Sequence, residues 1–264
     1  MNNKKAQASH EREILERVRI FVRIGNLDYF YGFSQADIAR LRSMLLNLTQ
    51  NMETTFPDFY GLTHCVELFR VSSSMESKKG SEQKRQDGDL AVTINQDDEH
   101  AAQSGNQHPR VYVREHPTHS YDNLTENVQR QFTKHCESKA HAAHIYDTTI
   151  FVIELPEADL ECMLWPIENV NIEGLRIGDL QPKYTGKELS GLYRLSRDKS
   201  ILEWMRQFSS EVDFVFFVTP YVIEAINLHH ISEITAFLPW RLNVYRKPSF
   251  TVASSAPVEL RKTE

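Results

Sequence analysis

The segment HCESKAHAAH, from His135 to His144, collects side chains that bind transition metals. Glu137, His141 and His144 are spaced at i, i+4 and i+7, so a continuous helix would bring them to one face, as a zinc or iron site requires. At roughly 100° per residue, however, the apolar residues between Leu124 and Phe132 fall on a different side of that helix. We therefore expect the three candidate ligands to face water, and we predict neither a bound metal nor another cofactor.

His135 and Cys136 lie at the border of the same apolar stripe. A histidine there is expected to be a hydrogen-bonded core residue, and the thiol is expected to be unreactive. The three cysteines, Cys65, Cys136 and Cys162, are odd in number and widely spaced. This pattern fits reduced thiols and neither a disulfide framework nor a zinc site.

Two acids at the ends of apolar runs indicate a second kind of chemistry. Glu154 lies near the end of TIFVIEL, and Asp213 lies near the start of VDFVFFV, where metal-dependent hydrolases and nucleases hold catalytic carboxylates. The nearby Lys that a nuclease would use is missing beside both acids. Farther along, TPYVIEAINLHH predicts a helix that begins at Thr219, where an anion could bind, and ends at His229 and His230. The candidate catalytic residues are therefore Glu154, Asp213, His229 and His230.

The stretch FSQADIARLRSMLLNLTQ begins as many DNA-reading helices do. Ser34 and Asp37 have the spacing of a capping box, but a helix-turn-helix would need a break about eight residues later. Apolar residues continue at helical spacing to Met52, with no Gly or Pro before Pro57. We therefore predict one amphipathic helix over 34–52, with an apolar stripe that packs on the core or on a second copy of the chain. If DNA is bound, the exposed candidates are Gln35, Arg40 and Arg42.

Charge and composition limit the possible function further. The net charge is -6, which argues against a protein that coats nucleic acid by bulk attraction, although residues 1–50 carry eight basic and five acidic side chains. The start of the chain has no apolar signal region, and no apolar run is long enough to span a bilayer. We expect a cytoplasmic protein without a membrane partner. Phosphate-binding glycine motifs and the GxSxG nucleophile motif do not occur.

The order of the expected elements predicts an α/β or α+β fold in one domain, with a mixed sheet and helices packed on it. Residues 9–60 are predicted to be a mainly helical part, although 17–24 also alternate as an edge strand would. Residues 72–109, polar and without aromatic side chains, are predicted to be a disordered insertion, flanked by the strands VELFRV and RVYVRE. Residues 110–247 are expected to form the α/β core, with helices over 122–146 and 156–164, and residues 248–264 a loose tail.

Two functional hypotheses follow from these patterns. The preferred one is a non-catalytic intracellular protein that binds a macromolecule, either DNA as a regulator or a protein partner as a subunit of an assembly. The alternative is a metal-dependent hydrolase or nuclease that uses dispersed acidic and histidine residues.

Overall fold

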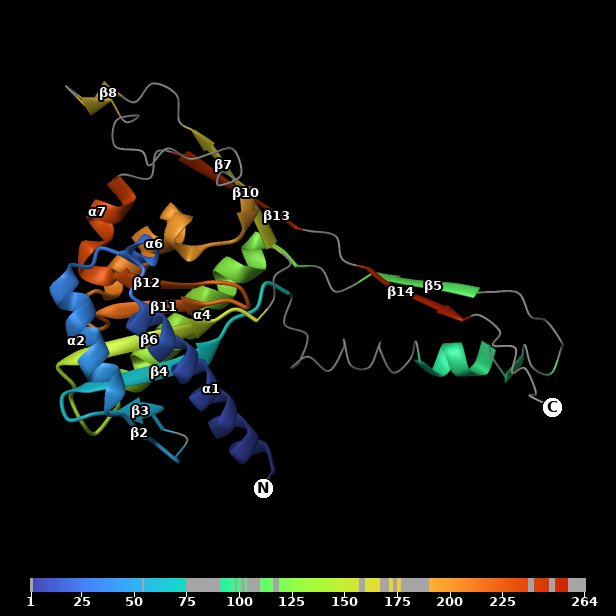
Figure 1. The fold of residues 1–264 in the computed structure, drawn as a ribbon, viewed down its shortest axis with the longest axis horizontal. Coiled ribbons are helices and arrows are strands. Elements are labelled where there is room, and N and C mark those ends of the chain that lie inside the picture. The colour runs from blue at the N-terminus through green and yellow to red at the C-terminus, as the bar shows by residue number, and fades with distance from the viewer. Residues whose placement is uncertain are drawn as a thin grey trace.

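The computed structural model describes residues 2–53, 55–74, 91–97, 99–100, 103, 110–115, 119–156, 160–166, 171–172, 175–176, 190–236, 240–246 and 250–255. At its centre is a seven-stranded mixed sheet (Figure 1). In spatial order its strands are β1 (Phe30–Tyr31), β12 (Ile223–Asn227), β11 (Phe214–Val218), β6 (Thr148–Glu154), β4 (His64–Arg70), β3 (Phe59–Tyr60) and β2 (Thr49–Gln50). Strands β4, β6 and β11 run parallel to one another, whereas β12, β3 and β2 each run antiparallel to the preceding neighbour toward the centre.

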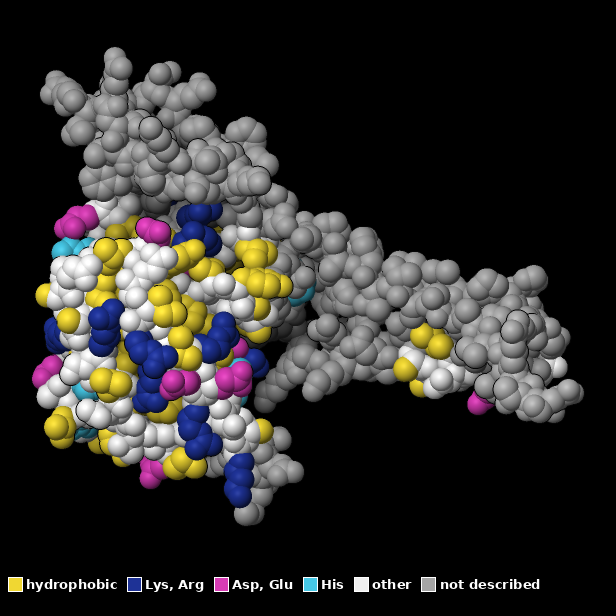
Figure 2. Space-filling model, in the orientation of Figure 1, with side chains coloured by type: hydrophobic (Ala, Val, Ile, Leu, Met, Phe, Trp, Pro, Cys, Tyr) yellow, Lys and Arg dark blue, Asp and Glu magenta, His cyan; other side chains and the backbone are white. Residues whose placement is uncertain are grey.

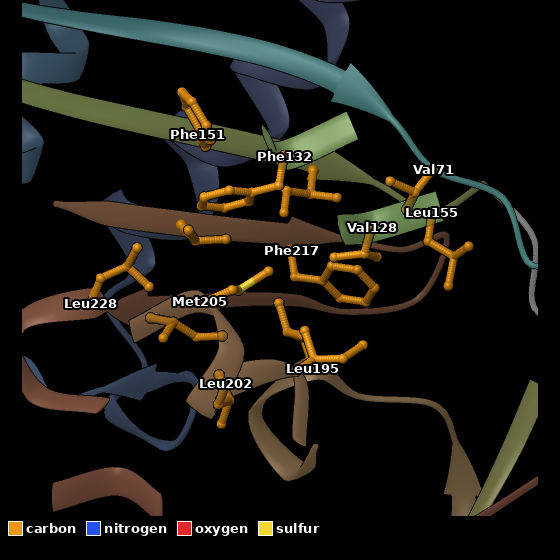
Figure 3. Packing of buried hydrophobic residues seen from close by; sticks show 14 of the residues in the cluster. Val71, Val128, Phe132, Phe151, Leu155, Leu195, Leu202, Met205, Phe217 and Leu228 are labelled. Atoms are coloured by element: carbon orange, nitrogen blue, oxygen red, sulfur yellow. The ribbon is translucent and has the colours of Figure 1, made fainter. Parts of the chain in front are cut away.

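Helices cover both faces of this sheet, which confirms the predicted fold class. Helices α1 (Asn2–Ile24) and α2 (Gln35–Leu46) pack on one face, and α4 (Tyr121–Ala140), α6 (Lys199–Met205) and α7 (Ile231–Ala236) pack on the other. Because both faces are covered, every residue of β6 and β11 is buried. Figure 3 shows the core on the α4 face, where Phe132, Phe151 and Phe217 pack with Leu202 and Met205.

The remaining elements lie outside the central sheet. A three-stranded sheet consists of β10, β7 and β13, and β5 pairs with β14. The bounds are β5 (Arg110–Glu115), β7 (Leu160–Pro166), β8 (Asn171–Ile172), β9 (Leu175–Arg176), β10 (Ser190–Leu192), β13 (Trp240–Arg246) and β14 (Phe250–Ser255), with 3-10 turns η1 (Leu27–Tyr29), η2 (Leu195–Arg197), η3 (Arg206–Phe208) and η4 (Leu228–His230). None of the helices in the described ranges is long and apolar enough to cross a bilayer.

Helix α1 settles the ambiguity over residues 17–24 in favour of the helix. It ends before Gly25, whose φ of +65° is a left-handed conformation that glycine adopts without strain. Helix α2 begins as predicted, because Ser34 and Asp37 form a capping box. It ends at Leu46 instead of Met52, however, and β2 follows within a few residues. The helix-turn-helix reading is therefore excluded by structure as well, since a strand stands where the second helix would lie.

Two arginines join the last turns of α1 and α2 by hydrogen bonds. Arg19 of α1 donates to the carbonyl of Leu45 at 2.7 Å, and Arg42 of α2 donates to the carbonyl of Val22 at 2.9 Å. Each helix thus satisfies a carbonyl in the last turn of the other, which would otherwise lack a partner.

Two predicted helices are strands. The region expected to be a helix over 156–164 contains β7 from Leu160, and the helix expected after Thr219 is replaced by a turn that leads into β12. The Thr219 hydroxyl oxygen accepts the N–H of Val222 at 3.0 Å, which closes that turn. Strand β12 then pairs antiparallel with β11. A short apolar run does not distinguish a buried strand from a buried helix by periodicity.

The boundaries of the predicted parts also differ from the structure. Strands β1 to β4, which lie in or near the mainly helical part 9–60, belong to the central sheet, so the α/β core begins well before residue 110. Strand β5 forms where expected but pairs with β14, which lies inside the predicted loose tail 248–264. Of the predicted insertion 72–109, residues 91–97 are helical. Residues 75–90, 104–109 and 256–264 lie outside the described residues.

Candidate functional site

The structure separates the predicted catalytic residues into two groups. Glu154 lies at the carboxyl end of β6, next to Thr219, whereas Asp213 lies before β11, where its N–H bonds the carbonyl of Thr149. Thr149 and Glu154 are five residue steps apart on β6, which corresponds to roughly 16 Å along the strand. Glu154 and Asp213 therefore do not converge on one site.

Asp213 and the two histidines make local contacts. One Asp213 oxygen accepts the N–H of Thr149 at 2.8 Å, and the other lies 3.0 Å from Nε2 of His229. His230 pairs separately with Glu233 at 2.9 Å. Asp213 thus links the start of β6 to the turn η4. The two histidines have different partners and do not form one site.

The predicted metal candidates are likewise apart. Helix α4 ends at Ala140, so His144 lies beyond it, where its ring contacts Tyr146 with centroids 4.5 Å apart. Glu137, His141 and His144 are all exposed. Within the described ranges, no group of three or more His, Cys, Asp or Glu side chains is placed to hold a metal ion.

The DNA-contact candidates lie on α2, on a face that carries many basic side chains (Figure 2). Gln35 is exposed in the first turn, Arg40 donates to the Thr148 hydroxyl at 2.8 Å, and Arg42 binds the end of α1 as described above. The apolar stripe of α2 is buried against the chain's own sheet, so it is not open to a second copy. Its buried residues are Ile38, Leu41, Met44 and Leu45.

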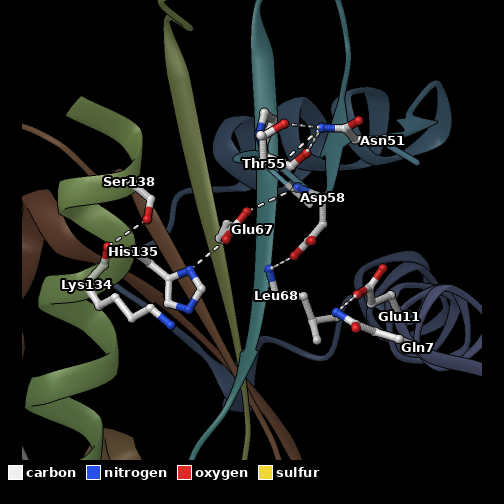
Figure 4. A network of polar contacts seen from close by, with 11 residues as sticks. Gln7, Glu11, Asn51, Thr55, Asp58, Glu67, Leu68, Lys134, His135 and Ser138 are labelled. Carbon is white, nitrogen blue, oxygen red and sulfur yellow. Dashed lines mark hydrogen bonds and ion pairs between the residues drawn. The ribbon is translucent and has the colours of Figure 1, made fainter. Parts of the chain in front are cut away.

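A cluster of acidic side chains that the sequence did not indicate lies at the edge of β4 (Figure 4). Glu67, which is 6% exposed, accepts the N–H of Asp58 at 3.1 Å and bonds Nδ1 of His135 at 2.6 Å. Asp58 in turn accepts the N–H of Leu68 at 2.7 Å. Strand β3 begins at Phe59, and the side chain of the preceding residue, Asp58, accepts a backbone N–H of β4 where one more residue of β3 would have continued the ladder.

The electrostatics of this cluster are unfavourable for negative charge. Burial raises the pKa of Asp58 to about 8, and the carboxylates of Glu67 and Glu11 add to the increase, while the bond from Leu68 opposes it. Glu11, on α1, is 7% exposed and accepts hydrogen bonds from Gln7 and Gln50. Three acids from α1, the residue before β3, and β4 thus share one partly buried region. We call Glu11, Asp58 and Glu67 the acidic cluster.

One signal in the sequence could have indicated this cluster. Glu67 stands inside the apolar run VELFRV, and an acid inside a strand that is covered on both faces needs a specific partner. That partner, His135, was predicted to be a hydrogen-bonded core histidine, and the structure confirms this. Its ring also stacks on Phe69, with centroids 4.4 Å apart. The contribution of Asp58 has no comparable signal.

The carboxyl ends of the parallel strands form a second polar region. Glu154, whose side chain is 7% exposed, accepts bonds from Nε of Arg70 at 2.6 Å and from His10 of α1 at 2.8 Å. Burial raises the pKa of Glu154, but the bonds from Arg70 and His10 outweigh it and leave the pKa below its usual value. Arg17 of α1 donates to the carbonyl of Thr219 at 2.6 Å.

A shallow hollow lies near Thr219, and the space inside it, about 10 Å³, is that of roughly one water. Ligands of open α/β sheets bind at the carboxyl ends of the strands, but here Glu154 faces α1, whereas Leu155 and Tyr193 of the hollow belong to the core on the α4 face. Its lining is mainly apolar and contains Ser73, Leu155, Leu160, Leu192, Tyr193, Thr219 and Tyr221.

Comparison with known proteins leaves the fold and the sites as the only basis for function: no family model, no curated protein and no solved structure matches this chain.

Proposed function

We propose that the protein acts in the cytoplasm by binding a macromolecule, and that this macromolecule is nucleic acid. The observation that carries the proposal is the gathering of basic side chains on the outer side of α1 and α2 (Figure 2). The chain as a whole carries a net charge of -6, so this local excess of positive charge runs against the overall composition. We call this region the basic surface, formed by Lys5, Arg12, Arg17, Arg19, Arg23, Arg40 and Arg42.

The arginines of the basic surface differ in their roles. Arg19, Arg40 and Arg42 bond to groups of the fold, which fixes their side chains. Arg12 and Arg23 are exposed on α1. They are therefore the better choice for testing phosphate contacts without disturbing the ends of the helices.

Removal of both exposed charges should weaken DNA binding and its dependence on salt. Each lost phosphate contact lowers the slope of log K against log salt by about 0.9 for duplex DNA, so Arg12→Gln with Arg23→Gln should lower it by up to about 2. Fluorescence anisotropy with labelled DNA over a range of KCl concentrations measures this slope.

The matched control is Lys199→Gln with Arg206→Gln, which removes two exposed charges from the α6 side of the molecule. The control should behave as wild type. If the wild-type protein shows no binding even at low salt, the nucleic-acid proposal is wrong. Equal slopes for both double variants would move the binding proposal to a protein partner.

A second candidate function is metal-dependent hydrolysis of phosphodiester bonds, which the acidic cluster favours. Mg²⁺ usually keeps several waters and is held by one or two carboxylates together with phosphate oxygens. Asp58 and Glu67 supply two carboxyl groups where β3 pairs with β4, and a divalent cation would offset the burial and the repulsion that together raise the pKa of Asp58. Such an ion activates water for attack on phosphorus and stabilises the leaving oxygen.

Metal binding should therefore depend on the acidic cluster. We expect Mn²⁺ to raise the melting temperature of the wild-type protein, since a ligand that binds only the folded state stabilises it. Asp58→Asn and Glu67→Gln should each abolish most of this rise, whereas Glu203→Gln, at an exposed acid of α6, should retain it. A Mn²⁺ response that is the same in all four proteins, or absent from the wild type at millimolar Mn²⁺, would exclude this candidate.

A further inference from the structure

We propose that the outer face of α1 binds the phosphate backbone of a nucleic-acid duplex along the axis of the helix, without reading the base sequence. Four basic residues follow one line on this face: Lys5, Arg12, Arg19 and Arg23. We call them the α1 row. This inference rests on the proposed nucleic-acid binding and adds the form of the nucleic acid and the direction in which it lies on the protein.

Helix geometry places the α1 row on one line. Its members follow one another at intervals of seven, seven and four residues. These intervals are close to whole numbers of helical turns, so the four directions around the axis differ by only about 40°. At about 1.5 Å per residue, the row extends over roughly 27 Å. Figure 2 shows dark blue side chains that follow the diagonal course of α1 in Figure 1.

The α1 row is open to solvent, because α1 packs on the sheet through another side. Lys5, Arg12 and Arg23 are exposed. Arg19 is 30% exposed, and its bond to the carbonyl of Leu45 fixes its side chain. Glu16 is an acid beside the row, where it pairs with Arg19 at 3.4 Å. The row thus presents positive charge along most of the helix, with Glu16 as a local exception.

The residue types on this surface favour a duplex over a single strand. Proteins that bind single strands stack the bases on aromatic side chains. The one aromatic residue of α1, Phe21, packs against Phe30 in the core with ring centroids 4.7 Å apart, and α2 contains none. In a duplex the bases are already paired and stacked, and the phosphates alone supply much of the affinity. The α1 row therefore matches the needs of a duplex.

The surroundings of α1 favour contact with phosphates over contact with bases. The major groove admits a single helix, but the last turns of α1 have α2 beside them, joined by the bonds of Arg19 and Arg42. The sheet lies beneath. The C-terminal half of α1 is therefore too broad to enter the groove and rests on the backbone, which carries no direct sequence information. A row of roughly 27 Å corresponds to about eight base pairs.

Fluorescence anisotropy tests the form of the nucleic acid. The labelled probes are two DNA duplexes of unrelated sequence, an RNA duplex and a single strand, each of about 16 base pairs or nucleotides, twice the length of the row. We expect equal affinity for the two DNA sequences and weaker binding of the single strand. The better of the DNA and RNA duplexes identifies the source of the backbone.

Lys5→Gln tests the far end of the row. It should lower the slope of log K against log salt by about 0.9 for a DNA duplex, because one phosphate contact is lost. Lys199→Gln removes an exposed lysine from α6 and should keep the wild-type slope. Melting curves for each variant verify the fold.

Glu16→Gln tests the line itself, because it should tighten binding. Removal of one negative charge beside the row should raise the affinity for the duplex roughly twofold to threefold at low salt, the scale of a single charge pair in water. It also frees the Arg19 guanidinium for a phosphate. The matched control is Glu203→Gln, which breaks a similarly exposed pair with Lys199 on α6 and should leave the affinity unchanged.

These results separate the inference from the proposed function. Tighter binding of duplex than of single strand, together with the opposite effects of Lys5→Gln and Glu16→Gln, supports the inference. Equal affinity for duplex and single strand, or wild-type behaviour of both variants, overturns it. In that case the proposed function still stands if Arg12→Gln with Arg23→Gln lowers the slope. It falls as well if no nucleic acid binds.

Discussion

Asp58→Asn should make the protein more stable than wild type at pH 8 and should remove most of the loss of stability between pH 4 and pH 8. Burial and the neighbouring acids raise the pKa of Asp58 from 3.8 to about 8 in the folded state. The unfolded chain releases that proton near pH 4, so the folded state binds more protons in this range. The contribution of Asp58 to stability is thus complete below pH 4 and is lost as the pH rises through 8.

The size of this effect is limited by the linkage relation. Stability falls by at most about 1.4 kcal/mol for each pH unit in the range, and relaxation of the partly exposed site reduces this, so we expect a gain of roughly 2 kcal/mol at pH 8. Urea unfolding at several pH values in the presence of a chelator measures it. An amide oxygen can still accept the N–H of Leu68, which preserves the local structure.

The control for this experiment is Asp28→Asn, because Asp28 is an exposed residue of η1. It should follow the wild-type dependence on pH. If stability of Asp58→Asn and of wild type falls in parallel between pH 4 and pH 8, the carboxyl of Asp58 is not protonated in the folded protein.

Glu224→Ala should destabilise the protein by about 3 to 5 kcal/mol, the usual cost of removing one partner of a buried ion pair. Glu224 is fully buried on β12 and accepts bonds from Nε of Arg194 at 2.7 Å and from the Ser196 hydroxyl at 2.5 Å. The substitution leaves the Arg194 guanidinium, whose side chain is 18% exposed, without its counter-charge.

Two further variants show whether the unpaired charge is the cause. Arg194→Met combined with Glu224→Ala removes both charges and should recover part of the lost stability. Glu203→Ala breaks the exposed pair with Lys199 and should change stability by less than about 1 kcal/mol. Urea unfolding at pH 7 measures all three. A double variant that is less stable than Glu224→Ala would show that the pair is not the main contribution of Glu224.

The parts of the fold that the sequence predicts are those with strong local signals. Strands β6 and β11 are continuous apolar runs, and the start of α2 carries its own capping residues. Strand β12 has no such signal: IEAIN suits a helix as well as a strand, and only pairing with β11 decides it. The end of α2 similarly depends on a distant residue, Arg19, which binds the carbonyl of Leu45.

The candidate sites depend even more on tertiary contacts. Glu137, His141 and His144 would share one helix face only if α4 continued to His144. The helix ends at Ala140, so they do not. Glu67 is bonded to His135, and the two residues are 68 positions apart in the sequence. The hollow at the carboxyl edge likewise combines residues from Ser73 to Tyr221. No local spacing encodes either arrangement.

The two outermost strands of the central sheet, β1 and β2, are only two residues long. A long, flat outer strand presents a row of unsatisfied N–H and C=O groups onto which another polypeptide can add. Flanks this short offer only a few such groups, so this sheet is a poor template for growth by strand addition. The protein is therefore protected at both flanks against the edge-to-edge aggregation to which open sheets are prone.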